Sequence, residues 1–336
     1  MKAGLKSVSI AVCMLGLAMP AMAQELKLGD FQTTQHVLSK DGSQYWMKEV
    51  EKRTGGKIKF VHYPAEQAAK AKGIIDAVKS GVLDVGFVGT LYNTDRLPLN
   101  SIVGLPGLGN TAAEGSRALH KMTKESILKE EFVNEGVYPL FAVVLPPYQI
   151  LLKNKKVNSA RDWNGLKIRT GGTTQALTAR ALGAVGVSMP GPEVYTAVER
   201  GTVDGVMFPL SSVPGYNLQE VVKHISTNAS LGGFGMTMVV NKALFDKQSA
   251  DVKKAMLEAG DATAAHLGKA QDDSIGDLLA KWKAAGIDVF EFSKDQLKTM
   301  DDAMAPVNEE WVTRVGKQHP QAKALLEQYQ KVLASQ

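Results

Sequence analysis

The chain has 336 residues, 44% of them hydrophobic, and its 39 basic and 34 acidic residues give a net charge of +5. The basic residues are interspersed with acidic ones, so the composition does not indicate a nucleic-acid-binding protein. A single cysteine, Cys13, excludes a disulfide framework and a thiolate metal site. A chain of this length can form two α/β domains of ordinary size.

The N-terminus has the pattern of a secretory signal peptide. Lys2 and Lys6 precede the apolar run VSIAVCMLGLAMP, and small residues follow it at 21 and 23. We therefore expect a signal peptide over residues 1–23, cleaved after Ala23, whose removal takes Cys13 with it. The apolar run is too short to span a bilayer. The expected location of the mature chain is the periplasm.

The first half of the mature chain alternates strand and helix patterns. Alternating or continuous apolar residues predict strands, and helical periodicity predicts helices between them. The predicted strands cover 25–31, 57–64 and 82–89, and the predicted helices cover about 40–54 and about 66–80. This β-α-β-α-β order is typical of a parallel sheet covered by helices.

The second half repeats this order, and at one place it repeats the letters. DAVKSGVLDVGFV (76–88) aligns with TAVERGTVDGVMF (196–208). In each copy a helix is predicted to end at a glycine and to pass into a buried strand. Asp84 and Asp204 occupy matching positions, where we expect them to be buried and to accept backbone hydrogen bonds. The two copies predict two α/β lobes of related construction.

Two segments are candidates for connections between the lobes, VVLPPYQ (143–149) and LGGFGMT (231–237), because proline and glycine pairs interrupt both. They divide the chain into lobe I, with residues 24–147 and about 235–249, and lobe II, with residues 148–234. Each lobe is expected to take part of the C-terminal region.

The C-terminal region is predicted to be mostly helical. Ser249 is expected to cap a helix over 250–285, which is longer than one lobe and should span both. A strand and further helices are expected over 286–336. Ser293 and Gln296 have the spacing of a capping box for one of these helices.

Common catalytic and cofactor motifs are absent from the sequence. The patterns GxGxxG, GxSxG and HExxH and the Walker loop do not occur, and the six histidines have no ligand-like spacing. We therefore expect no catalytic residue, no cofactor and no metal ion.

One segment, NGLKIRTGGTTQALTARALGA (164–184), indicates an anion-binding site. Leu166 and Ile168 alternate with basic residues, which predicts a short strand that ends on Arg169. Two glycines then lead into a helix, whose N-terminal amides are directed at the same place. A guanidinium beside a helix start favours an anion, although an arginine in a surface ion pair fits the spacing as well.

The run GLKIRT, followed by ALGAVGVSMPGPEVYTAVERGTVDGVMFP, resembles the periplasmic solute receptors of tripartite ATP-independent (TRAP) transporters, the DctP-like family. WMKEVEKRTGGKIKF in the first half is similar to the same family, so the resemblance covers nearly the whole mature chain. It implies an α/β fold, a two-lobe periplasmic-binding-protein clamshell with parallel-rich sheets and a long back helix. It also implies a small organic acid as ligand and, as partners, the small and large transmembrane proteins of a TRAP transporter.

The resemblance implies a role for Arg169, which stands at the arginine of the family pattern G-x-K-x-R. In the family this arginine clamps the ligand carboxylate. A planar guanidinium offers two parallel donors to a carboxylate, which lysine does not.

The chain departs from the family at three positions around the expected ligand. Members that bind sialic acid, and several that bind dicarboxylates, have a second arginine where this chain has Gln149, directly after Tyr148. They have an asparagine in place of Phe208 and an acidic residue in place of Gly89, beside Thr90. The missing cation and the added aromatic favour a monocarboxylate with an apolar or aromatic body, such as an aromatic, keto or hydroxy acid. A C4-dicarboxylate receptor of the same family is the alternative.

Further ligand-binding candidates come from the loops that follow the predicted strands. They are Thr33, Gln35, His36, Gln67 at the start of the second predicted helix, Thr90 and Tyr92. The run VMFPLSS lacks the acidic ligands that some keto-acid receptors of the family use for a metal ion. A periplasmic enzyme or a sensor module on the same fold would be a competing interpretation, and the missing nucleophile–base arrangement disfavours the enzyme.

Overall fold

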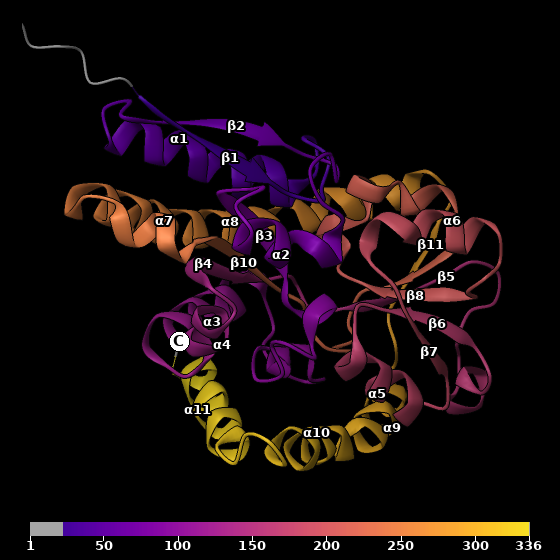
Figure 1. Ribbon diagram of the computed structural model, residues 1–336. Helices are drawn as coiled ribbons and strands as arrows, with labels where there is room; N and C mark the ends of the chain where they lie inside the picture. Colours follow the sequence, from indigo (N-terminus) through magenta and orange to yellow (C-terminus); the bar gives the residue numbers. More distant parts are fainter. Residues whose placement is uncertain (1–22, 336) are drawn as a thin grey trace, which may run out of the picture.

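The computed structural model, described here for residues 23–335, contains two sheets that lie side by side (Figure 1). The first has the strand order β2-β1-β3-β10-β4, and the second has the order β11-β9-β5-β8-β6-β7. We call the part built on the first sheet lobe I and the part built on the second sheet lobe II. The expected signal peptide lies outside the described residues, apart from Ala23. Within the described part of the chain, no helix is both long and apolar enough to cross a membrane.

Lobe I has helices on both faces of its sheet. Its elements are β1 (Gln24–Gly29), α1 (Gln44–Arg53), β2 (Ile58–Tyr63), α2 (Ile74–Lys79), β3 (Val85–Gly89), α3 (Ala112–Glu125), α4 (Leu128–Asn134), β4 (Val137–Val144), β10 (Gly235–Asn241) and α7 (Lys242–Lys247). β1 pairs in parallel with both β2 and β3, which confirms the parallel arrangement predicted for the first half.

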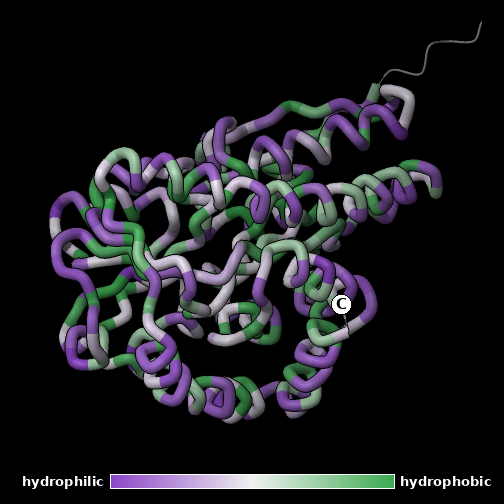
Figure 2. Tube along the Cα trace, turned by 180° about the vertical axis from the view of Figure 1, so that it is seen from behind, coloured by the Kyte–Doolittle hydropathy of each residue, from purple (hydrophilic) through white to green (hydrophobic). Residues whose placement is uncertain are grey.

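Lobe II has shorter strands. Its elements are β5 (Gln149–Leu152), β6 (Lys167–Thr170), α5 (Thr173–Ala181), β7 (Val185–Ser188), α6 (Val194–Glu199), β8 (Gly205–Phe208), β9 (His224–Ser226) and β11 (Asp288–Phe290). β6 pairs in parallel with β7 and β8, as β1 does with β2 and β3. In both lobes, hydrophobic residues gather in the strands and hydrophilic ones on the outer helices and loops (Figure 2).

The second helix is shorter than the sequence pattern predicted, and the prediction was wrong over its first half. Ala65 and Glu66 have φ of 52° and 61°, which an α-helix excludes. The Glu66 carboxylate accepts the Ala71 amide hydrogen at 2.8 Å and holds this turn. Helical structure begins only at Ala71, so Gln67 lies exposed in the turn and opens no helix.

The repeated letters correspond to repeated corners between helix and strand. Oδ2 of Asp84 accepts the Lys27 amide hydrogen at 2.7 Å, and Oδ2 of Asp204 accepts that of Lys167 at 2.8 Å. The predicted backbone hydrogen bonds are therefore confirmed. The predicted burial is wrong, because Asp204 is exposed and Asp84 is only partly buried. Both corners lie where a strand begins at the surface of its lobe.

Two connections cross between the lobes; the first lies within the predicted segment 143–149, and the second overlaps the predicted segment 231–237 but begins before it. Residues 145–148 lead from β4 to β5, and residues 227–234 lead from β9 back to β10. The two lie side by side, because the Leu145 amide donates to the Phe234 carbonyl at 3.0 Å and the Tyr148 amide to the Gly232 carbonyl at 2.8 Å.

Helices join the lobes on either side of these connections. α8 (Ala250–Ala284) begins at the predicted cap, where the Ser249 hydroxyl accepts the Val252 amide hydrogen, and it packs on α1, α3 and β4 of lobe I and on β11 of lobe II. The predicted long helix that spans both lobes is confirmed. α9 (Lys294–Met304), α10 (Pro306–Gly316) and α11 (Ala322–Ala334) then form an arc from lobe II to lobe I (Figure 1). α9 begins with the predicted capping box.

Candidate functional site

A small cavity lies where the two lobes meet the two connections. Its volume is about 20 Å³. Six aromatic side chains surround it, and we call them the aromatic cage: Phe31, Tyr92, Tyr148, Phe208, Tyr216 and Phe234. Phe31 and Tyr92 belong to lobe I, Phe208 and Tyr216 to lobe II, and Tyr148 and Phe234 to the connections. Any movement between the lobes would therefore change the shape of the cage.

The cage is continuous, since neighbouring rings contact one another around it. Ring centroids are 5.5 Å apart between Phe31 and Tyr92 and 4.7 Å apart between Tyr92 and Phe234. The rings of Phe208 and Tyr216 meet edge to face at 5.7 Å. Such geometry is favourable for aromatic pairs and would suit an inserted aromatic ring equally well.

Arg169 provides the positive charge at this cavity. Its guanidinium carbon lies 5.1 Å from the centroid of the Phe208 ring, and the side chain is completely buried. Nε and Nη2 donate to the Met189 carbonyl at 3.0 and 2.7 Å, and Nη1 donates to the Met207 carbonyl at 3.3 Å. The Tyr92 and Tyr148 hydroxyls also make side-chain hydrogen bonds with the guanidinium. The N–H groups that the two carbonyls leave over are therefore directed at the cage, where a carboxylate could accept them as a bidentate pair.

No carboxylate pairs with Arg169 within residues 23–335. The residues that line the cavity include no aspartate, glutamate or lysine. A buried cation without a counter-ion is costly, because burial removes its hydration and nothing negative replaces it. The arrangement therefore provides an uncompensated positive charge in an aromatic, water-poor environment.

The cage tyrosines are neutral and surround this charge. Burial raises the pKa of Tyr92, Tyr148 and Tyr216, and the Arg169 charge opposes the shift in each without cancelling it. The Tyr92 hydroxyl also accepts the Gly191 amide hydrogen at 2.9 Å, a hydrogen bond from lobe II to lobe I. Tyr92 thus connects the lobes beside the guanidinium.

The N-terminal amides of the helix that follows β6 are less available to an anion than the sequence predicted. The Gly171 amide already donates to Oε1 of Gln175 at 2.6 Å, and Nε2 of Gln175 donates to the Gly233 carbonyl at 2.8 Å. Gln175 therefore fastens the beginning of α5 to the second connection. The Gly171 amide, two residues after Arg169, is thus occupied by the protein itself.

The predicted ligand-binding residues fall into two groups. His36, Tyr92, Tyr148 and Phe208 line the cavity, and Arg169 lies against Phe208. The other five, Gln149, Thr90, Thr33, Gln35 and Gln67, do not line it.

Gln149 shows why a neighbour in sequence need not share a site. Its side-chain oxygen accepts the Ser226 hydroxyl and the Ala229 amide, each at 2.9 Å, and its nitrogen donates to the Ala229 carbonyl. The adjacent Tyr148 points the other way, because successive residues alternate sides in an extended chain. Gln149 thus holds the connection together behind the cavity.

The remaining candidates lie further out or are engaged elsewhere. The Thr90 hydroxyl is buried and donates to the Gly235 carbonyl at 3.2 Å. Thr33 and Gln35 are exposed and line an outer groove with Asp273 of α8.

The sequence did not single out eight of the residues that line the cavity: Phe31, Leu38, Leu145, Pro209, Ser212, Tyr216, Phe234 and Met236. Phe31 directly follows the first strand, in the same loop as His36, and could have been found from that position. Phe234 lies in the glycine-rich connection. Ser212 and Tyr216 lie in the irregular segment after β8, for which periodicity gives no signal.

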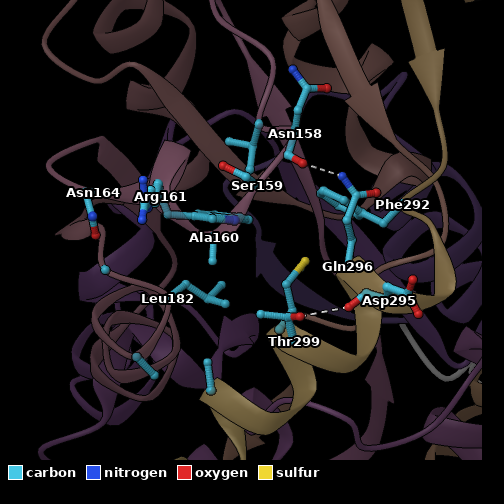
Figure 3. Close-up of a pocket in the computed structure, with 16 residues that line it drawn as sticks. Asn158, Ser159, Ala160, Arg161, Asn164, Leu182, Phe292, Asp295, Gln296 and Thr299 are labelled. Atoms are coloured by element: carbon cyan, nitrogen blue, oxygen red, sulfur yellow. Dashed lines mark hydrogen bonds between the residues drawn. The ribbon is translucent and has the colours of Figure 1, made fainter.

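A second, larger hollow of about 530 Å³ lies between α9, the end of α5 and the turn over 160–163. Figure 3 shows Leu182, Phe292 and Thr299 around it, with Arg161 and Asp295 at its borders. None of its lining residues has a buried polar side-chain atom without a partner. It is an outer groove without the buried charge that marks the first cavity. Within residues 23–335, no cluster of three or more His, Cys, Asp or Glu residues is arranged to hold a metal ion.

Known proteins resemble this chain over nearly its whole length. The family described as bacterial extracellular solute-binding protein, family 7 (DctP), matches residues 28–314. The C4-dicarboxylate-binding periplasmic protein DctP of Rhodobacter capsulatus is 28% identical over 318 residues, which are 90% of this chain and 91% of that protein.

Two solved structures have the same fold and a similar sequence. A TRAP solute-binding protein from Rhodoferax ferrireducens, in complex with copurified benzoate, has a TM-score of 0.87 at 25% identity, over 93% of this chain and 98% of that one. A TRAP periplasmic solute-binding protein from Bordetella bronchiseptica, with bound (R)- and (S)-mandelate, has a TM-score of 0.85 at 25% identity, over 93% and 99% of the two chains.

Proposed function

This chain belongs to the bacterial extracellular solute-binding protein family 7, the DctP family, and on that basis we propose that it binds an aromatic monocarboxylate in the cavity beside Arg169. It is a TRAP solute receptor, and its family and fold are those of transport proteins rather than enzymes. The family is periplasmic, and its members bind small organic acids and work with membrane subunits.

The proposal depends above all on the burial of Arg169 without an acidic partner. A ligand carboxylate would supply the missing negative charge and accept the guanidinium N–H groups that otherwise interact with the Tyr92 and Tyr148 hydroxyls. In a site from which water is excluded, this charged pair would be a principal source of affinity.

The charge of the site supports one carboxylate rather than two. The described residues that line the cavity include no cation, and Arg169 supplies a positive charge from behind the Phe208 ring. A second carboxylate would be desolvated without a partner, which costs several kcal/mol. The aromatic cage supports a ligand with a ring, and the relatives that contain benzoate and mandelate agree with that class.

Binding requires movement between the lobes. A cavity of about 20 Å³ holds roughly one water molecule, so a ring enters only when the cage widens. The two connections and α8 are the segments about which lobes I and II would rotate. We infer that the receptor opens to admit the acid and closes on it, which buries the charged pair.

Isothermal titration calorimetry tests this proposal with benzoate, mandelate, hexanoate and succinate. We expect benzoate or mandelate to bind more tightly than the other two. In Arg169→Met, which replaces the buried charge with an apolar side chain of similar length, we expect at least about a hundredfold loss of affinity. Arg169→Lys should lose about tenfold or more, because an ammonium lacks the planar pair of donors.

Arg180→Met is the matched control. Arg180 lies eleven positions later, on α5, with its side chain exposed in an ion pair with Glu310. Its loss should leave every dissociation constant unchanged. Tight binding of succinate would contradict the proposed ligand class, and unchanged benzoate affinity in folded Arg169→Met would contradict the clamp.

A further inference from the structure

Two buried polar atoms at the cavity have no partner within the described residues, Nε2 of His36 and Oγ of Ser212. Both residues line the cavity, and their exposed fractions are 1%. Buried polar groups in proteins are nearly always hydrogen-bonded, so two unpaired ones at the same small cavity point to a polar atom of a ligand.

The structure defines which proton His36 offers. Its Nδ1 accepts the Leu38 amide hydrogen at 3.1 Å, so the proton of the neutral ring is on Nε2. Burial lowers the pKa of His36 to about 3, so the ring is neutral at physiological pH. Nε2 therefore presents a neutral N–H donor to the cavity. The Ser212 hydroxyl can either donate or accept.

His36 and Arg169 are separated by two rings of the cage. Arg169 lies over Phe208, Phe208 contacts Tyr216, and Tyr216 contacts the His36 ring at a centroid distance of 5.0 Å. The polar pair is thus distinct from the carboxylate position.

The His36 ring also packs closely against Gly215 of lobe II. A Cβ atom on Gly215 would lie 2.0 Å from Cδ2 of His36, so only a glycine admits the ring there. His36 comes from lobe I, directly before the helix that begins at Leu38, whereas Ser212 and Gly215 follow β8 in lobe II. The pair is therefore assembled across the two lobes.

We propose that His36 and Ser212 recognise a neutral oxygen, a hydroxyl or carbonyl group, on the part of the aromatic ligand farthest from its carboxylate. This inference rests on the proposed function, because it assigns the far end of the same ligand. A neutral donor and a hydroxyl fully satisfy such an oxygen and leave it uncharged. They provide no positive charge for a second carboxylate, so the same pair selects hydroxy and oxo acids over diacids.

Titration calorimetry with benzoate and its three hydroxy derivatives tests the inference. We expect 3- or 4-hydroxybenzoate to bind at least tenfold more tightly than benzoate. 2-Hydroxybenzoate is the control ligand, because its hydroxyl lies beside the carboxylate and cannot reach the pair. It should gain no affinity through His36 or Ser212.

Two variants test whether His36 and Ser212 cause the preference for hydroxybenzoate over benzoate. In Ser212→Ala and in His36→Phe, the dissociation constants of the preferred hydroxybenzoate and of benzoate, measured on the same variant, should differ by no more than about threefold. Ser212→Ala only removes an oxygen, so it preserves the test if the larger ring of His36→Phe disturbs folding.

The possible failures are distinguishable. Benzoate binding with no hydroxyl preference, or an equal loss for benzoate and its hydroxy derivative in Ser212→Ala, would overturn the inference and leave the proposed function intact. Failure of every aromatic carboxylate to bind would overturn the proposed function, and this inference with it.

Discussion

The two lobes repeat one strand–corner arrangement, yet only one of them places an arginine beside the cavity. Gly29 pairs with Gly86 in lobe I, and Arg169 pairs with Val206 in lobe II, two positions after the matching Asp84 and Asp204. In this register KLGDFQTTQ (27–35) aligns with KIRTGGTTQ (167–175). The place of the arginine in lobe II is therefore the place of a glycine in lobe I.

Packing explains why lobe I has no arginine at this position. A Cβ on Gly29 would lie 2.4 Å from Cδ1 of Leu83, so the space is filled by an apolar side chain. Lobe I instead lines the cavity with neutral side chains, among them Phe31, His36 and Tyr92. Under the proposed function, the repeated backbone divides two tasks: lobe II would hold the anion, and lobe I would complete the wall around the rest of the ligand.

If lobe I acts as a closing wall, an obstacle between the lobes should weaken binding strongly. Gly172 has extended backbone, and a Cβ there would lie 2.3 Å from the Leu91 carbonyl oxygen across the interface. We expect Gly172→Ala to weaken binding of the preferred acid at least about a hundredfold, or about 2.8 kcal/mol. Calorimetry measures this loss, and small-angle scattering should show a more open receptor.

Gly73→Ala is the control for this variant, because a Cβ there meets nothing within 4 Å. It lies in lobe I, and its substitution should leave affinity and shape unchanged. If Gly172→Ala bound as tightly as the unaltered protein, the lobes would not need this close contact to hold the ligand. The division of tasks between them would then be wrong.

The sequence predicted the fold well where local patterns determine it. The long helix after Ser249 and the capping box at Ser293 were predicted correctly because caps and periodicity are local. The start of the second helix was not, because the left-handed Glu66 and its bond to Ala71 are not visible in an apolar pattern.

The candidate site was less predictable, since its residues meet only in three dimensions. Arg169 was singled out by a motif, and His36 by its place in a loop. Tyr216 and Ser212 come from an irregular segment whose position depends on packing between the lobes. Gln149 was expected beside the ligand, yet the backbone turns its amide toward Ser226. Which side of an extended connection faces a cavity is set by tertiary structure.

The neutral character of the lobe I wall predicts a pH dependence of stability. The pKa of His36 is about 3 in the folded protein and 6.5 at its ordinary value. Below pH 6.5 the unfolded chain therefore binds a proton that the folded one does not. The free energy of unfolding consequently decreases as the pH is lowered. Between pH 7 and pH 5, we expect the free energy of unfolding of His36→Gln to decrease by about 2 kcal/mol less than that of the unaltered protein. Urea unfolding at several pH values measures this difference.

Ser212→Ala serves as the control, because it alters the same cavity without removing a titrating group. Its pH dependence should equal that of the unaltered protein. An identical slope in His36→Gln would mean that the buried ring takes up a proton as readily as the unfolded chain. The wall opposite Arg169 would then not be neutral at mildly acidic pH.

The repeated corners allow the smallest and most direct comparison of the lobes. Each aspartate accepts one backbone hydrogen bond of nearly equal length, but the bond of Asp84 is partly buried and that of Asp204 is exposed. Removing the acceptor leaves an amide less accessible to water in lobe I, so we expect Asp84→Ala to cost about 1–2 kcal/mol and Asp204→Ala about 0.5–1 kcal/mol. Urea unfolding of both variants measures the difference. A larger cost for Asp204→Ala would show that burial does not determine which aspartate contributes more to stability. Lobe II, which contains the arginine, would then depend more on its corner than lobe I.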